Sequence, residues 1–307
     1  MYEVKLWDDG KIRALTVLAG IRQDGEFGED VADITEVRGA IIEKARGNPL
    51  YATYLCRTAL GVARGDIPTG VDVGVVPYLL SVPKFDVNLS AYYRWLLDAV
   101  EADTGAVIVV RMLALVRFSL TAEELGEILP PFKGLVPRVL SLLLPVLIGD
   151  SGHGGVRVYH ESFQRFVQAG VDEGPAREAI LKPAREWLDA RGFLSDERAF
   201  RWLFSLLGTA GSDAEIIGLC DVDFVANAAA HDQPGDAVMA NLTTAAQAAV
   251  RVGALPDLAR IIELTRAADC LYRWRLEDDD LAQVYGRAFA ALHGRTLVGV
   301  PDCARAT

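Results

Sequence analysis

The segment Arg157–Gln168 constrains the fold of this chain more than any other stretch, because a β pattern runs directly into an amphipathic helix there. Residues 146–148 and 156–159 are largely apolar, and the glycine-rich stretch Gly149–Gly155 between them is typical of a turn. The two short runs are therefore expected to pair as a β-hairpin. The helix predicted over Ser162–Ala169 follows the second strand almost at once.

Three helices are predicted before this hairpin. The first covers Thr104–Arg117, which is apolar over most of its length. Thr121 is followed three residues later by Glu124, the spacing of a capping box, so a second helix is expected to begin there. The third helix is predicted over Gly134–Leu144. Three helices followed by a β-hairpin is the order of a winged-helix domain.

The rest of the chain is also predicted to be mainly helical. Before the winged helix, we expect helices over 11–19 and 35–47, one that begins at Pro49, and a connector at Gly65–Pro83 that contains one short helix. From Gly174 onward, apolar residues recur at i, i+3, i+4 and i+7, which predicts a stacked helical array. No clean repeat of tetratricopeptide length is found, so the array is TPR-like by analogy only. The predicted fold class is mostly α: a helical domain, a winged-helix domain and a helical array.

Charge and cysteine spacing argue against several classes of function. The formal net charge of −11 over 307 residues disfavours nonspecific nucleic-acid binding, which depends on Lys and Arg. No Cys-x-x-Cys pair or Cys/His cluster occurs, so we expect neither a zinc site nor a disulfide framework. The chain begins without a signal-peptide pattern, and its most apolar stretches, 107–116 and 136–148, are too short to cross a bilayer. A cytoplasmic protein with no membrane association is expected.

The sequence offers no self-contained catalytic set. It has no G-x-x-x-x-G-K-[ST] phosphate loop, no acidic strand of the Walker B type, no G-x-S-x-G and no H-E-x-x-H. The stretch Gly149–Gly155 lacks Lys and does not open a helix, which favours a wing turn over a phosphate cradle. We therefore expect that the chain alone is not an enzyme, with no catalytic and no metal-binding residues.

Two residues are candidates for ligand binding. His160 alternates with Val156 and Val158, so the three side chains are expected on one face of a strand. A histidine there can hydrogen-bond a phosphate oxygen, or it can be a satisfied structural residue. Pro49, in Gly47–Leu50, opens a helix, where its missing N–H carries no penalty. Gly-x-Pro is also common at an ordinary boundary between a loop and a helix, without any ligand.

Together, these two segments resemble the STAND ATPases, the signal-transducing NTPases that include NACHT and NB-ARC proteins. Tyr159–Phe163, with its His-x-Ser-Phe unit, resembles the end of the family's winged-helix domain, and Gly47–Leu50 resembles its GxP motif. The resemblance implies that His160 contacts the β-phosphate of bound ADP and that Pro49 lies against the adenine base. The chain departs from the family in lacking the phosphate loop and the metal carboxylates.

The resemblance implies five segments. They are an edge remnant of a nucleotide-binding domain at 1–20, a helical domain with the GxP motif at 21–87, a winged-helix domain at 88–170, a helical sensor array at 171–295 and a frayed tail at 296–307. It also implies the switch and sensor portion of a nucleotide-gated signalling ATPase, in bacterial innate immunity or regulation, which responds by differential affinity for two states. ADP or ATP, with Mg²⁺, would bind only beside a complete nucleotide-binding domain. The array would take a protein ligand.

Two other functions fit parts of the sequence. One is a stand-alone helical adaptor that binds another protein through the segment from Gly174 onward. The other is a winged-helix DNA-binding regulator, but its third helix offers only Arg138 for base recognition, which uses Arg, Asn and Gln. Residues 88–170 contain seven Lys or Arg against eight Asp or Glu, hence a net charge of −1. We therefore do not expect a nucleic-acid partner.

Overall fold

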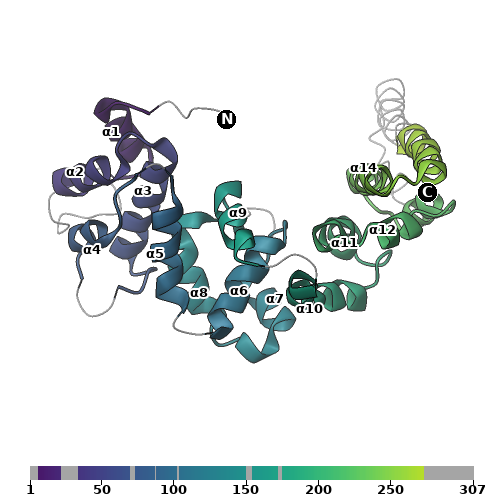
Figure 1. Ribbon diagram of the computed structural model, residues 1–307, viewed down its shortest axis with the longest axis horizontal. Helices are drawn as coiled ribbons and strands as arrows, with labels where there is room; N and C mark the ends of the chain where they lie inside the picture. The colour runs from purple at the N-terminus through teal and green to yellow at the C-terminus, as the bar shows by residue number, and fades with distance from the viewer. Residues whose placement is uncertain are drawn as a thin grey trace, which may run out of the picture. The chain divides into compact units, whose positions relative to one another are not determined.

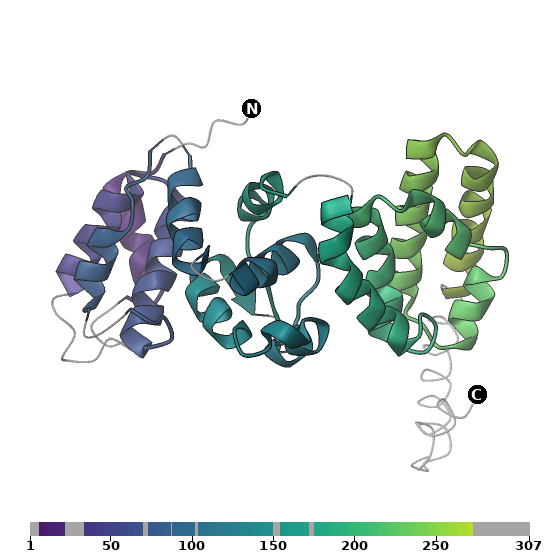
Figure 2. The same ribbon diagram turned by 60° about the horizontal axis from the view of Figure 1, so that its bottom comes forward.

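The structure is a computed structural model. It describes residues 6–21, 34–69, 73–86, 88–101, 104–149, 154–171 and 175–272. Within them the chain is mainly α-helical, with one two-stranded antiparallel sheet (Figures 1 and 2). The prediction of a mostly-α fold is confirmed. The chain forms two compact units, of which the first ends at Trp187 and the second begins at Leu188, so the boundary falls within α10 (Pro175–Arg191). Residues 1–5 of the predicted edge remnant and the tail at 296–307 lie outside the described residues.

The first unit begins with four helices that pack on one another: α1 (Asp9–Leu18), α2 (Ile34–Ala45), α3 (Pro49–Arg64) and α4 (Val75–Ser81). Local sequence sets the ends of these helices. Asp8 caps α1 and Asn48 caps α3, because each side-chain oxygen accepts a backbone N–H from the first turn at 2.9 Å. Gly65 follows α3 in the left-handed conformation. The predicted start of a helix at Pro49 is confirmed.

A buried lysine joins α2 to the end of α4. The ammonium of Lys44 donates to the backbone carbonyls of Leu80 and Val82, each at 2.6 Å. Burial lowers the pKa of Lys44, because the charged ammonium loses solvent. The two charge-assisted bonds offset that loss, and they satisfy carbonyls at the C-terminal end of α4, where a positive charge is favoured.

The winged helix follows in the predicted order. Its elements are α5 (Ser90–Glu101), α6 (Thr104–Leu115), α7 (Ala122–Ile128), the 3₁₀ helix η1 (Pro130–Phe132), α8 (Val136–Leu143), the 3₁₀ helix η2 (Leu144–Val146), β1 (Leu147–Gly149), β2 (Val156–Val158) and α9 (Glu161–Ala169). The capping box is confirmed: the backbone N–H of Thr121 donates to Glu124 at 2.8 Å, and that of Glu124 donates to the Thr121 hydroxyl at 3.1 Å. Leu120 also pairs with Val156, so a third extended segment borders the hairpin.

The second unit is an array of helices. It contains α11 (Glu197–Ala210), α12 (Asp213–Leu219), α13 (Phe224–Ala230), α14 (Gly235–Val252) and a helical segment over residues 255–272. Its core is a stack of phenylalanine rings. Phe200 is fully buried, and its ring centroid lies 5.0 Å from that of Phe193 and 5.8 Å from that of Phe224. Rings in this arrangement attract one another beyond the burial of their area.

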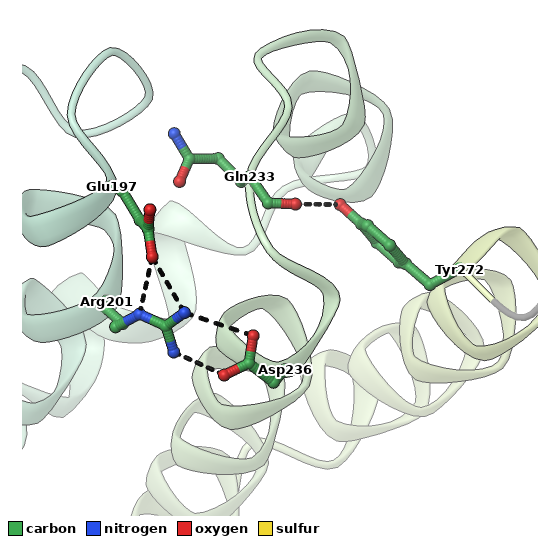
Figure 3. A network of polar contacts seen from close by, with 5 residues as sticks. All are labelled: Glu197, Arg201, Gln233, Asp236 and Tyr272. Atoms are coloured by element: carbon green, nitrogen blue, oxygen red, sulfur yellow. Dashed lines mark hydrogen bonds and ion pairs between the residues drawn. The ribbon is translucent and has the colours of Figure 1, made fainter. Parts of the chain in front are cut away.

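A polar network ties the helices of the second unit together (Figure 3). Arg201 of α11 donates to Glu197, one turn earlier on the same helix, and to both carboxylate oxygens of Asp236 at the start of α14. The hydroxyl of Tyr272 donates to the backbone carbonyl of Gln233 at 3.0 Å. The network therefore joins α11, the α13–α14 turn and the helical segment 255–272.

A second ion pair in this unit predicts a pH dependence. Arg251, at the end of α14, donates to both oxygens of Asp213, at the start of α12, at 2.6 and 3.1 Å. Hydrogen bonding from Arg251 lowers the pKa of Asp213, so the pair stabilises the fold above the unfolded value of about 3.9 and is lost as pH falls through the folded value. We expect Asp213→Asn to reduce the free energy of unfolding by about 0.5–1 kcal/mol at pH 7, because Arg251 is half-exposed and solvent screens its charge.

Urea denaturation at several pH values tests this expectation. The difference between wild type and Asp213→Asn should narrow toward zero as pH falls below about 4. Asp66 is exposed and has no ion pair within the described ranges, so Asp66→Asn is the matched control and should show no such narrowing. A constant Asp213→Asn difference across this pH range would contradict the role of the ion pair.

No helix in the described part of the chain is long and apolar enough to cross a membrane. In the same residues, no group of three or more His, Cys, Asp or Glu side chains is arranged to hold a metal ion. Cys56 and Cys220 are buried, and burial raises the pKa of each thiol to about 12, so neither is a thiolate at neutral pH.

Candidate functional site

His160 caps the helix that follows the hairpin. Its Nδ1 accepts a hydrogen bond from the backbone N–H of Ser162 at 3.1 Å, so it is the N-cap of α9. The strand β2 has already ended at Val158. The prediction that His160 shares one face with Val156 and Val158 is therefore wrong. Val158 is buried while His160 is exposed, because a bend at Tyr159 separates the end of the strand from His160, which serves as the N-cap of α9.

The capping bond also determines which nitrogen of His160 faces solvent. Because Nδ1 accepts from a backbone N–H, the proton of the neutral ring is on Nε2. Within the residues that the structure describes, Nε2 makes no hydrogen bond. The exposed edge of His160 is therefore an N–H donor, which can bind an acceptor such as a phosphate or carboxylate oxygen.

A hydrogen-bonded path runs from His160 into the interior of the first unit. Nδ1 of His160 lies 2.8 Å from the hydroxyl of Ser162, and that hydroxyl lies 2.6 Å from the hydroxyl of Tyr93 on α5. Tyr93 lies 3.5 Å, hydroxyl to hydroxyl, from Tyr54 on α3, the helix that Pro49 begins. The path thus connects α9, α5 and α3, which are far apart in the sequence.

Aromatic rings surround this path. The ring centroid of Tyr93 lies 5.2 Å from that of Phe163, and the centroid of Tyr54 lies 5.7 Å from Tyr92 and 6.3 Å from Tyr159. Burial raises the pKa of the Tyr54 and Tyr93 hydroxyls. Both hydroxyls therefore stay protonated at neutral pH and keep the path intact. Each ring pair of this kind contributes roughly 0.5–1.5 kcal/mol beyond its buried area.

Arg57 lies over the ring of Tyr159, the residue before His160, and was not identified from the sequence. It is half-buried on α3, and its guanidinium carbon lies 5.4 Å from the ring centroid of Tyr159, a cation–π contact. Burial lowers the pKa of Arg57, and no carboxylate pairs with it in the described part of the chain. The signal was present, because Arg57 follows Tyr54 by three residues and so shares its face of the helix.

Pro49 is the first residue of α3 and is half-buried. Gly47 before it adopts a φ of +81°, and its carbonyl accepts the backbone N–H of Trp7 at 2.7 Å. Tyr54 and Arg57 follow Pro49 on the same helix by five and eight residues, or about 8 and 12 Å along its axis. The structure therefore places Pro49 at the start of the helix whose middle contacts the segment of His160. The hydrogen bonds that His160 makes within the described residues are with Ser162 and not with Pro49.

Two neighbouring tyrosines test the importance of the hydrogen-bonded path. Tyr93→Phe removes the link between Ser162 and Tyr54, and we expect the free energy of unfolding to fall by about 1 kcal/mol. Among the residues that the structure describes, the buried hydroxyl of Tyr92 has no hydrogen-bond partner. Tyr92→Phe removes an unsatisfied polar group, so it should be neutral or stabilising by about 1 kcal/mol. Urea denaturation measures the free energy of unfolding of both variants. Equal losses would contradict a stabilising role for the hydrogen-bonded path.

No family model matches the sequence, and neither a curated protein nor a solved structure is significantly similar to the chain. The resemblance to STAND ATPases therefore continues to depend on the two motifs and on the order of the domains that contain them.

Proposed function

We propose that this chain is the switch and sensor portion of a STAND-type ATPase, which responds to nucleotide held by a separate or preceding nucleotide-binding domain. The observation that carries the proposal is the exposed Nε2–H of His160, whose orientation is set by the Nδ1 cap on α9. A donor fixed in this way can contact a phosphate oxygen without reorganising. The order of a helical domain, a winged helix and a helical array supports the same function.

The hydrogen-bonded path gives this contact a mechanism for signalling. A phosphate oxygen bound by the Nε2–H would hold the imidazole in place, and with it the Nδ1 that accepts the Ser162 N–H. The Ser162 hydroxyl continues the path to Tyr93 and Tyr54. Loss of nucleotide would release the imidazole and so loosen the hydrogen bonds that join α9 to α3 through α5. This is the local change that a two-state switch requires.

The chain alone is proposed to lack ATPase activity, because its sequence contains no phosphate loop and no Walker B carboxylate. We expect weak binding of ADP, with a Kd on the order of 1 mM, or about −4 kcal/mol. Calorimetry on the full chain measures this value. Submicromolar binding, or release of phosphate from ATP by the purified chain, would contradict the proposal that the nucleotide machinery is elsewhere.

Imidazole NMR signals test the role of His160 directly. His231 is the matched control, because it is also exposed and its Nδ1 bonds a backbone oxygen, that of Asn227, at 2.9 Å. Titration of the full chain with ADP should shift the His160 signals, and should shift those of His231 much less. Adenosine, which has no phosphate, should shift neither. Equal shifts of both histidines, or no shift of His160 at ADP concentrations well above the expected Kd, would refute the phosphate contact.

The alternative of a DNA-binding regulator gains no support from the winged helix. The third helix, α8, packs against α5, α6 and α7, and its residues Val136, Val139 and Leu143 are buried. A recognition helix reads the major groove with its exposed face, and the exposed residues of α8 are Pro137 and Arg138, which offer one base-reading side chain. The adaptor alternative shares the helical array with the proposed sensor, and both would bind a protein partner there.

A further inference from the structure

A cavity of about 450 Å³ lies between α5, α6 and α9 in the first unit. Its volume is in the range of pockets that hold small molecules. Leu97 of α5, Val107 of α6 and Phe166 of α9 form part of an apolar lining. None of the residues of the hydrogen-bonded path from His160 to Tyr54 lines it, so it is a separate site.

The charged groups of the cavity give it a positive balance. Arg94 of α5 and Arg111 of α6 line it together with one carboxylate, that of Asp98. Arg94 and Asp98 are one turn apart on α5, where such residues often pair. Yet neither arginine forms an ion pair or a side-chain hydrogen bond within the described ranges. Two guanidinium groups with free donors therefore border an apolar hollow.

We propose that this cavity binds a small amphipathic anion, with an apolar body and a single carboxylate or similar anionic group. The body would lie on Leu97, Val107 and Phe166, and its burial would supply most of the affinity. The anionic group would lie between Arg94 and Arg111, whose planar guanidiniums bind carboxylates in bidentate fashion. Asp98 disfavours a ligand with more negative charge, because two arginines and one aspartate leave a net charge of +1.

The bound anion would also affect α9. This helix packs on α6, and the side-chain amide of Gln168 donates to the carbonyl of Ala114, at the end of α6, at 2.8 Å. The cavity is bordered by Phe166 and Gly170, on either side of that bond. A ligand in the cavity contacts α5, α6 and α9 together and holds α9 in this position.

Fluorescence titration with anilinonaphthalene sulfonate tests the proposal on the full chain, because this probe has an apolar body and one anionic group. We expect saturable binding that weakens about tenfold in Arg111→Gln and in Arg94→Gln, each of which removes one charge-assisted contact. Asp98→Asn should tighten binding about twofold to threefold. Arg165→Gln is the matched control, because Arg165 is exposed on α9, pairs with Glu161 and does not line the cavity. It should leave binding unchanged.

A neutral probe separates charge recognition from a general loss of structure. Phenyl-naphthylamine lacks the sulfonate, so it should bind more weakly to wild type and respond to none of the three charge changes. Ala169→Trp, which fills the cavity from its exposed rim, should weaken both probes. The proposal is overturned if both arginine variants bind the sulfonate as wild type does. It is equally overturned if the neutral probe loses affinity in parallel with the anionic one, or if Ala169→Trp affects neither.

Discussion

Gly47→Ala is expected to destabilise the first unit by about 2–4 kcal/mol. Gly47 adopts a φ of +81°, which costs roughly 1–2 kcal/mol for a residue with a Cβ. An added Cβ would also lie 2.5 Å from the backbone carbonyl oxygen of Trp7, which a real Cβ does not approach so closely. Relief requires that Trp7 moves, and its N–H bond to the Gly47 carbonyl is then lost. Two separate penalties therefore fall on one methyl group.

Gly65→Ala is the matched control for this prediction. Gly65 follows the other end of the same helix, α3, with a φ of +76°, but nothing lies within 4 Å of an added Cβ. The Gly65→Ala variant should lose only the free energy that a Cβ costs at positive φ, about 1–2 kcal/mol. Thermal and urea denaturation of both variants give the comparison. If the two variants lose the same free energy of unfolding, the close approach of Trp7 does not constrain the Gly47 position. The glycine of the GxP-like segment then has only a conformational role.

Phe200→Ala is expected to have the largest effect in the second unit, a loss of about 3–5 kcal/mol. The Phe200 ring is completely buried and packs against those of Phe193 and Phe224, whose own centroids lie 6.4 Å apart. Its removal takes away the transfer free energy of a large ring and leaves a cavity whose walls, including Phe204, are held by several helices. The remaining structure collapses only partly into such a space, so both terms contribute.

Urea denaturation of the full chain with a probe of the second unit measures the loss. Val222→Ala is the control, because Val222 lies near Phe224 in the sequence but is 71% exposed. It should change stability by no more than about 0.5 kcal/mol. Similar effects of the two substitutions would mean that the phenylalanine stack is not the core of this unit.

Local chemistry made several features of the fold predictable. Pro49 sets the start of α3, and Thr121 with Glu124 sets that of α7, because a missing N–H and a reciprocal pair of capping bonds both act within one turn. The same reasoning placed the helices of the winged helix and its hairpin in order. Each of these inferences needs only residues that are neighbours in the sequence.

Contacts between distant residues were not predictable in this way. Tyr93 meets Ser162 across 69 residues, and Lys44 reaches Val82 across 38. No periodicity in either segment contains that information. The predicted position of His160 was wrong for a different reason. Side chains alternate between the two faces of a strand only while the strand continues. Here α9 begins at Glu161, so His160 belongs to the cap of a helix and faces solvent.

The packing of Tyr78, on α4, against Trp95, on α5, has an optical consequence. The ring centroids of these two residues lie 5.8 Å apart. At such a separation an excited phenol passes its energy to the indole, and little phenol emission remains. The emission spectrum of the unlabelled protein is therefore sensitive to whether α4 and α5 are in contact, so their separation can be followed in real time without a dye.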